Sequence, residues 1–154
     1  MALYKKIINK LINNNITISV AESCTGGMIS SKLTSEAGIS KVFSMGLITY
    51  SNIAKSNLLN ISPYYINKYG AVSYQTASIM VNNLQKKSKS KLCISTTGIV
   101  GPSGGTRSKP VGLVYIGIKY KNKISILKYI LQGSRNQIQR KTVKAVFEAL
   151  EKLI

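Results

Sequence analysis

Ser23 and Cys24 are the side chains best placed for chemistry, because they follow an apolar segment and precede a Gly26-Gly27 pair. The chain has no histidine and no aspartate, and its only carboxylates are Glu22, Glu36, Glu148 and Glu151. A nucleophilic Ser23 therefore cannot draw its base from a Ser-His-Asp triad. A lysine held neutral or a lone glutamate can serve as the base instead. Glu22 is the adjacent carboxylate, and orienting Lys55 or a backbone group is its other expected role.

The segment Ser23-Cys24-Thr25-Gly26-Gly27 also has plainer interpretations. It is neither a Gly-x-Ser-x-Gly nucleophile elbow nor a P-loop, because no Gly-Lys-Ser/Thr follows, and a serine that only caps a helix fits it as well. If the glycines open a helix, their N–H groups face an anion or a developing oxyanion. Cys24 is a rival nucleophile at such a helix end, although a small cysteine packed behind Ser23 is the simpler interpretation.

Hydrophobic periodicity predicts the elements that must hold these side chains. Helices are expected over 3–12, 28–33, 52–59, 63–69, 73–88 and 136–154. Strands are expected over 16–21, 42–50 and 92–97, followed by a hairpin of 111–120 and 124–131. Helices that alternate with strands, ending in one hairpin, predict a single α/β domain over 1–154. Its architecture should be a three-layer α/β/α sandwich with a mixed parallel and antiparallel sheet.

Two turns at strand ends carry the small polar residues. The first runs from Glu22 to Gly27, and the second starts at Thr96 and Thr97 and continues into a glycine-rich loop over 98–106. Ligands of α/β sheets bind at the carboxyl ends of the strands, so we expect both turns to face one crevice.

Composition limits the classes of partner. The chain has 154 residues, 44% of them hydrophobic, and no apolar run approaches the ~18 residues of a membrane span, so we expect a cytoplasmic protein. The net charge of +18 suggests nucleic acid, but 19 lysines against 3 arginines, with 21 isoleucines and 12 asparagines, indicate an AT-rich coding bias. The lysines are scattered, and the cluster Lys86, Lys87, Lys89 and Lys91 is interpreted as a solvated helix end. Nucleic acid is therefore not the expected partner.

Five blocks of the sequence, taken together, resemble the CinA C-terminal domain family. They are AESCTGG over 21–27, TYSNIAK over 49–55, YGAVS over 69–73, TGIVGPSGG over 97–105 and KPVG over 109–112. They follow the family's order and cover nearly the whole chain. The resemblance implies a three-layer α/β/α fold. For standalone members similar to nicotinamide-nucleotide amidohydrolase, it also implies hydrolysis of the carboxamide of nicotinamide mononucleotide (NMN) to nicotinate mononucleotide and ammonia.

The resemblance assigns catalytic roles to individual residues. It places the nucleophile on Ser23 and its partner on Lys55, a Ser-Lys pair that needs neither a metal nor a cofactor. Lys55 must be neutral to act as a base, and burial and a neighbouring cation, for which Arg135 is the candidate, would lower its pKa. Thr97 matches a threonine that can donate to the substrate. The family's Gly-Asp-Arg-like segment falls on 133–135, where Ser134 replaces the aspartate.

Substrate contacts are expected from the same blocks. Tyr50 is a candidate for ring stacking or a hydroxyl contact, and the substrate phosphate is assigned to Arg135 or the glycine-rich loop. The predicted binding residues are Tyr50, Thr25, Gly26, Gly27, Gly101, Gly104 and Gly105. The expected partners are NMN and further copies of the chain, in a dimer or larger homo-oligomer. Two other functions stay open: a catalytically silent nucleotide-binding domain, and a basic protein associated with nucleic acid in competence or DNA damage.

Overall fold

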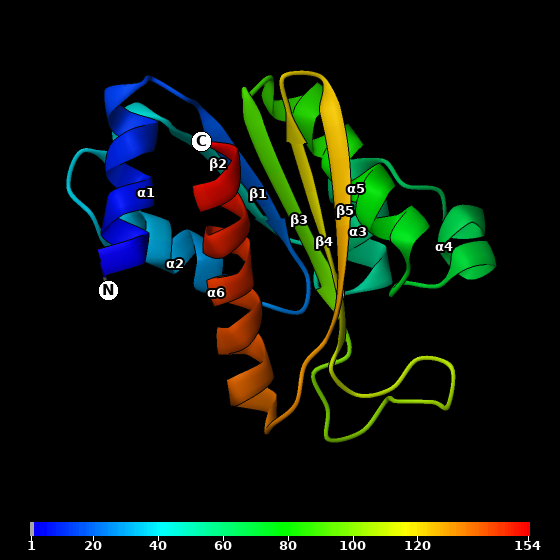
Figure 1. Cartoon of the computed structure of the whole chain (residues 1–154). Coiled ribbons are helices and arrows are strands. Elements are labelled where there is room, and N and C mark those ends of the chain that lie inside the picture. Colours follow the sequence, from blue (N-terminus) through cyan, green and yellow to red (C-terminus); the bar gives the residue numbers. More distant parts are fainter. Residues whose placement is uncertain (1) are drawn as a thin grey trace.

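A five-stranded mixed sheet forms the middle layer of the computed structural model, which describes residues 2–154 (Figure 1). The strand order is β2-β1-β3-β4-β5. The strands are β1 (Ile18–Glu22), β2 (Phe43–Ile48), β3 (Leu92–Gly98), β4 (Leu113–Tyr120) and β5 (Lys123–Ile130). The first three are parallel to one another, and β4 and β5 add an antiparallel hairpin. The predicted three-layer α/β/α fold with a mixed sheet is confirmed.

Helices cover both faces of this sheet (Figure 1). One face carries α1 (Ala2–Asn13), α2 (Met28–Thr34) and α6 (Arg135–Leu153), and the other carries α3 (Asn52–Leu59), α4 (Pro63–Tyr69) and α5 (Tyr74–Ser88). A short 3-10 helix, η1 (Ile39–Lys41), precedes β2 and was not predicted. β2 is shorter than the predicted 42–50, because the chain turns after Ile48 and the Ser51 side chain caps α3.

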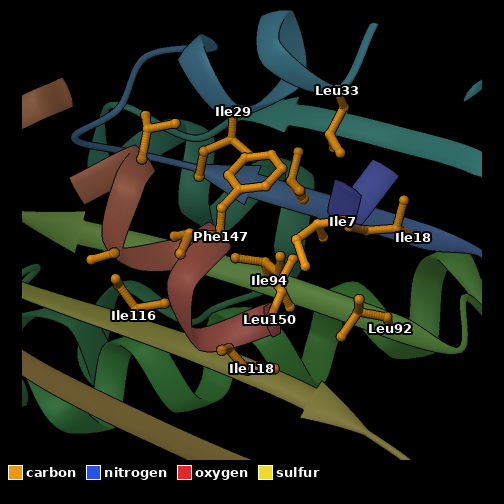
Figure 2. Packing of buried hydrophobic residues seen from close by; sticks show 14 of the residues in the cluster. Ile7, Ile18, Ile29, Leu33, Leu92, Ile94, Ile116, Ile118, Phe147 and Leu150 are labelled. Atoms are coloured by element: carbon orange, nitrogen blue, oxygen red, sulfur yellow. The ribbon is translucent and has the colours of Figure 1, made fainter. Parts of the chain in front are cut away.

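Two apolar cores hold the layers together. Figure 2 shows the larger one, where Ile7 of α1 and Phe147 and Leu150 of α6 pack onto strand residues such as Ile94. The smaller core lies on the other face, between the sheet and α3, α4 and α5. Because helices cover both faces, all five residues of β1 are buried, as expected for a central parallel strand.

Alternation along the strands decides which face each polar side chain reaches. Ile18 and Val20 belong to the core beneath α1, α2 and α6, whereas Ala21 belongs to the core beneath α3, α4 and α5. With a period of two, Glu22 points toward α2 and Ser23 is expected to continue toward the α3 face. The same rule places Thr96 on the α2 side and Thr97 on the α5 side of the neighbouring β3.

β1 and β3 lie side by side, with Glu22 opposite Thr96 in the parallel register. The chain passes from β1 to β2 on one side of β1, and β3 pairs with β1 on the other side. The carboxyl ends of β1 and β3 therefore form a topological switch point of the sheet. The Ser23 N–H donates to the Thr96 carbonyl oxygen (3.0 Å) and continues the ladder beyond β1. The two turns that were expected to face one crevice therefore lie next to each other. Among residues 2–154, no helix has both the length and the apolar character needed to span a membrane.

Candidate active site

The Lys55 ammonium group meets the Ser23 hydroxyl at the carboxyl end of β1. Lys55 Nζ lies 3.1 Å from Ser23 Oγ and donates to the Thr49 carbonyl oxygen at 2.9 Å. Both side chains are buried, and Lys55 is only 1% exposed. The distance between Nζ and Oγ is within the reach required for proton transfer between a nucleophile and its base.

Local sequence places Lys55 on the inner face of α3. The Ser51 side chain accepts from the Ala54 N–H and begins the helix, and Lys55 follows one turn into it. Leu59, one further turn along, belongs to the smaller core, so the same helix face carries Lys55 inward. Lysine is almost never fully buried without a counterion. Among the described residues no carboxylate pairs with Lys55, which is an arrangement that favours a neutral amine.

Burial lowers the pKa of Lys55 from its ordinary 10.5 to about 8. The expected contribution of a neighbouring Arg135 to this shift is not observed, because the Arg135 guanidinium is bound to Tyr50 and Gly101 instead. A neutral Lys55 has two N–H donors and one lone pair. It can therefore donate to Thr49 and accept the Ser23 hydroxyl proton at the same time.

Glu22 is fully buried and serves the start of α2, not Lys55. Its carboxylate accepts from the Thr25 hydroxyl (2.7 Å), the Ile29 N–H (2.8 Å), and the Ser30 N–H (2.9 Å) and hydroxyl (2.7 Å). Of the roles predicted for Glu22, orienting backbone groups is the one that the structure shows. The four donors and the opposite face of β1 separate Glu22 from Ser23, so Glu22 is not placed as a general base for it.

The same contacts change which N–H groups can hold an oxyanion. Of the two glycine N–H groups that were expected to face an anion, that of Gly26 donates to the Ser23 carbonyl oxygen (3.1 Å). The N–H groups of Ile29 and Ser30, in the first turn of α2, donate to Glu22. Within residues 2–154, the N–H groups of Cys24, Thr25 and Gly27 have no protein acceptor. These three, and not Gly26, are the free donors next to Ser23.

Cys24 is packed behind the nucleophile, as the simpler interpretation predicted. It is 2% exposed, and burial raises the pKa of its thiol from 9.0 to about 12. The thiol is therefore protonated at neutral pH, which is opposite to the requirement for a cysteine nucleophile. Gly98 leaves room for it, because a Cβ at that position would lie 3.2 Å from the Cys24 sulfur and 2.7 Å from Val114.

The two predicted threonines have their hydroxyl protons engaged. Thr97 faces the cavity beside Ser23, and its hydroxyl donates to the Ala71 carbonyl oxygen (2.7 Å). In this arrangement its oxygen is free to accept from a ligand, although donation was the expected role. Thr25 is fully buried between Glu22 and Thr96 (Oγ1 to Oγ1, 2.9 Å), so its side chain supports the turn and does not line the cavity.

Arg135 and Tyr50 form the outer edge of the site. The Arg135 guanidinium donates to the Tyr50 hydroxyl and to the Gly101 carbonyl oxygen (2.8 Å). Ser134, which replaces the family's aspartate, caps α6: it accepts from the Gln137 N–H, and the Gln137 side chain accepts from the Ser134 N–H. Arg135 is thus held by two partners from other loops without a carboxylate, and the helix keeps its cap.

A cavity of about 200 Å³ opens over the Ser-Lys pair. Its lining includes five residues that the sequence did not single out for the site, namely Asn52, Ala71, Val72, Gly98 and Val100. All five belong to the same sequence blocks as the predicted residues, so the blocks themselves carry the signal for them. None of the glycines predicted to bind substrate lines this cavity, and Gly104 and Gly105 are exposed in the loop beyond it.

Comparison with known proteins identifies the family of this chain. The sequence model of the CinA C-terminal domain matches residues 1–154. The chain belongs to the CinA C-terminal domain family. It is 45% identical over 137 residues to a protein of Thermoanaerobacter pseudethanolicus, and 48% identical over 142 residues to one of Clostridium novyi, both carrying the name competence-damage inducible protein. These alignments cover 89% and 92% of this chain but only 33% and 34% of the relatives, so the chain spans about a third of their length.

Solved CinA structures share the entire fold. The competence/damage inducible protein CihA of Agrobacterium tumefaciens superposes with a TM-score of 0.93 at 36% identity, covering 99% of this chain and 93% of that chain. The competence damage-inducible protein A of Klebsiella pneumoniae also gives 0.93, at 25% identity, covering 99% and 95%. The CinA fold is therefore established for this chain by both sequence and structure.

Proposed function

We propose that this CinA domain hydrolyses the carboxamide of NMN to nicotinate mononucleotide and ammonia, with Ser23 as nucleophile and Lys55 as its base. One observation carries the proposal: a lysine that is 1% exposed and has no counterion among residues 2–154 lies 3.1 Å from a serine hydroxyl at the switch point of the sheet. Burial of a charged amine without a counterion is unfavourable, so a lysine with no role as a base would be expected at the surface. The arrangement suits a base.

The first half of the reaction forms an acyl-enzyme. Ser23 Oγ attacks the carboxamide carbon, and its proton moves to Lys55 Nζ. The tetrahedral intermediate then collapses, the bond between carbon and nitrogen breaks, and Lys55 returns the proton to the departing nitrogen, which leaves as ammonia. The products of this half are an ester on Ser23 and a neutral Lys55.

The second half reverses these roles with water. Lys55 takes a proton from a water molecule as its oxygen attacks the ester carbon, and the bond from carbon to Ser23 Oγ breaks. The Lys55 proton returns to Oγ, so serine and neutral amine are both restored. Water supplies the oxygen of the new carboxylate, and no oxidant, metal or second substrate is required.

The free N–H groups after Ser23 are the donors for the oxyanion of both intermediates. In nucleophile elbows, the N–H of the residue after the nucleophile has this role. Here that residue is Cys24, and Thr25 and Gly27 offer the other unpaired N–H groups of the turn. Removal of one such donor typically lowers kcat by about 10²–10³.

The size of the cavity divides the substrate between two regions. About 200 Å³ is below the ~300–1,000 Å³ of pockets that enclose a whole drug-sized ligand, so only the nicotinamide end is expected to lie inside. The ribose phosphate would extend past Tyr50 toward Arg135. The guanidinium has five N–H donors and uses two of them for Tyr50 and Gly101, which leaves donors for a phosphate.

Ammonia release from NMN by the purified protein tests the proposal. Activity should survive EDTA, be lost in Ser23→Ala and Lys55→Ala, and persist in Cys24→Ala. Unchanged turnover in Ser23→Ala would refute the mechanism. NMN binding measured by calorimetry, with no product under any of these conditions, would instead identify a silent nucleotide-binding domain.

A further inference from the structure

A second and larger cavity, of about 660 Å³, lies at the other end of the sheet from Ser23. It is bounded by Ile16, just before β1, by Lys91, just before β3, and by the β4–β5 turn. Ser23 and Thr97 lie at the opposite ends of these same strands. The end of α1 and the C-terminus lie at this end of the molecule, whereas the glycine-rich loop lies at the other (Figure 1). The proposed chemistry makes no use of this cavity.

The wall of this second cavity is cationic. Lys89, Lys91, Lys119 and Lys121 line it, and no acidic side chain does. Two of the ammonium groups are positioned by neutral oxygens: Lys119 donates to Asn82 Oδ1 (2.8 Å) and Lys91 to the Asn15 carbonyl oxygen (3.0 Å). Neither bond neutralises a charge. The two ion pairs of the described chain join other lysines to Glu151 and Glu148, so none of the four lysines of the cavity forms an ion pair.

The rest of the lining is apolar or aromatic. Ile16 is buried, the Tyr120 ring is half-buried, and Leu153 and Ile154 complete this part of the wall. The Ile154 carbonyl oxygen accepts from Lys10 (3.0 Å), and Glu151 at the end of α6 accepts from Lys6 (2.9 Å). A cavity with an apolar and aromatic side, polar amides and a cationic rim suits a ligand with a ring at one end and several negative charges at the other.

We propose that this cavity is a binding site for an organic polyphosphate of the nucleotide class, separate from the Ser23 site. Its phosphates would contact Lys89, Lys91, Lys119 and Lys121, the last of which lies over the Tyr120 ring (5.3 Å to its centroid). The ring of the ligand would lie against the apolar part of the wall formed by Ile16, Leu153 and Ile154. Concavity distinguishes this site from a nucleic-acid surface, since a duplex is bound by an extended basic stripe. The cluster that the sequence suggested was a solvated helix end thus divides into two parts: Lys89 and Lys91 line the cavity, and Lys86 and Lys87 do not.

Isothermal titration calorimetry with ATP and with inorganic phosphate as probes tests the site at about 0.15 M salt. ATP should bind once per chain and more tightly than phosphate. The triple variant Lys89→Gln, Lys91→Gln, Lys121→Gln should weaken ATP binding by about tenfold or more, because charge-assisted hydrogen bonds are lost. The matched control Lys41→Gln, Lys86→Gln, Lys87→Gln removes the same charge from exposed positions outside the cavity and should change the affinity less than about twofold.

Three results would overturn the proposal. The first is no heat of binding with ATP. The second is an equal loss of ATP affinity in both triple variants. Displacement of ATP by a DNA duplex that both variants bind equally poorly has the same meaning, because either result shows a diffuse cationic surface. The third is loss of ATP affinity in Arg135→Gln, which would place ATP at the Ser23 site. None of these measurements depends on amide hydrolysis, so failure here and failure of the proposed reaction are distinguishable.

Discussion

The buried Lys55 makes a quantitative prediction about stability and pH. Its pKa is about 8 in the folded protein and 10.5 in its ordinary environment. Between these values the unfolded chain binds one more proton than the folded chain, so stability rises with pH. At 1.36 kcal/mol for each pKa unit, the buried ammonium costs about 3 kcal/mol at pH 7, and roughly 2 kcal/mol of this is regained between pH 8 and pH 10.

Urea denaturation of the wild type and of Lys55→Met from about pH 6.5 to pH 10 measures this effect. Eighteen other lysines and nine tyrosines also titrate at alkaline pH, but they are common to both proteins. Their contribution cancels in the difference between the two free energies of unfolding. That difference should be flat below about pH 7 and should then move by roughly 2 kcal/mol in favour of the wild type by pH 10.

Catalysis should report the same group. If Lys55 is the base, kcat/KM for NMN should increase about tenfold per pH unit below its pKa and level off above about pH 8. A stability difference that does not change with pH would refute the buried ammonium. A rate that keeps rising to about pH 10 would show an ordinary lysine and exclude Lys55 as a base with a lowered pKa.

Three further predictions concern the groups around the pair. Glu22→Gln should lower the free energy of unfolding by about 2–3 kcal/mol, because the amide NH2 group would face N–H donors of α2. The control Glu148→Gln, at an exposed position, should change it by less than about 0.5 kcal/mol, and urea denaturation of both variants compares the two values. Gly98→Ala should lower kcat more than it raises KM in the ammonia assay, since its Cβ would press on Cys24 beside the nucleophile; wild-type kcat would contradict this. Ser134→Asp should keep the N-cap of α6 and add a negative charge at a helix start that has no acidic residue in its first turn. Thermal unfolding should show a stabilisation of about 0.3–1 kcal/mol, and kcat should not fall.

Much of the fold was accessible from the sequence because each element carries its own signal. The run of Ile and Val in β1, the serine that opens the helix at 73–88 and the helical periodicity of α6 all agree with the structure. Boundaries shifted by one or two residues, because contacts from other segments decide where a strand ends. The start of β1 is an example: the strand was expected from residue 16 but begins at Ile18, because the Ile16 N–H donates to the Leu11 carbonyl oxygen of α1 (2.9 Å).

The candidate site was less accessible, because it depends on where hydrogen bonds go. A Gly26-Gly27 pair at a helix start predicts two free N–H groups, but only that of Gly27 is free, because the Gly26 N–H donates to the Ser23 carbonyl oxygen. Arg135 was expected to act on Lys55, yet it reaches Tyr50 and Gly101 from the first turn of α6. The second cavity is formed by residues from five separate segments and has no contiguous sequence signal. The homo-oligomer, for its part, stays a prediction that light scattering on the purified protein can check.

The alternation of side chains along β1 explains why the Glu22 carboxylate does not contact the Lys55 amine, although Glu22 is adjacent in sequence to Ser23. Glu22 and Ser23 are neighbours in sequence, and Lys55 contacts Ser23. If the Glu22 carboxylate also contacted Lys55, it would raise the pKa of Lys55 and keep the amine charged. The strand directs Glu22 to the α2 face, where four hydrogen bonds hold its charge, and Lys55 approaches Ser23 from the α3 face. The sheet therefore lies between the charge and the base. A neutral lysine at Ser23 requires this separation, because a carboxylate on the α3 side would favour the charged form of Lys55.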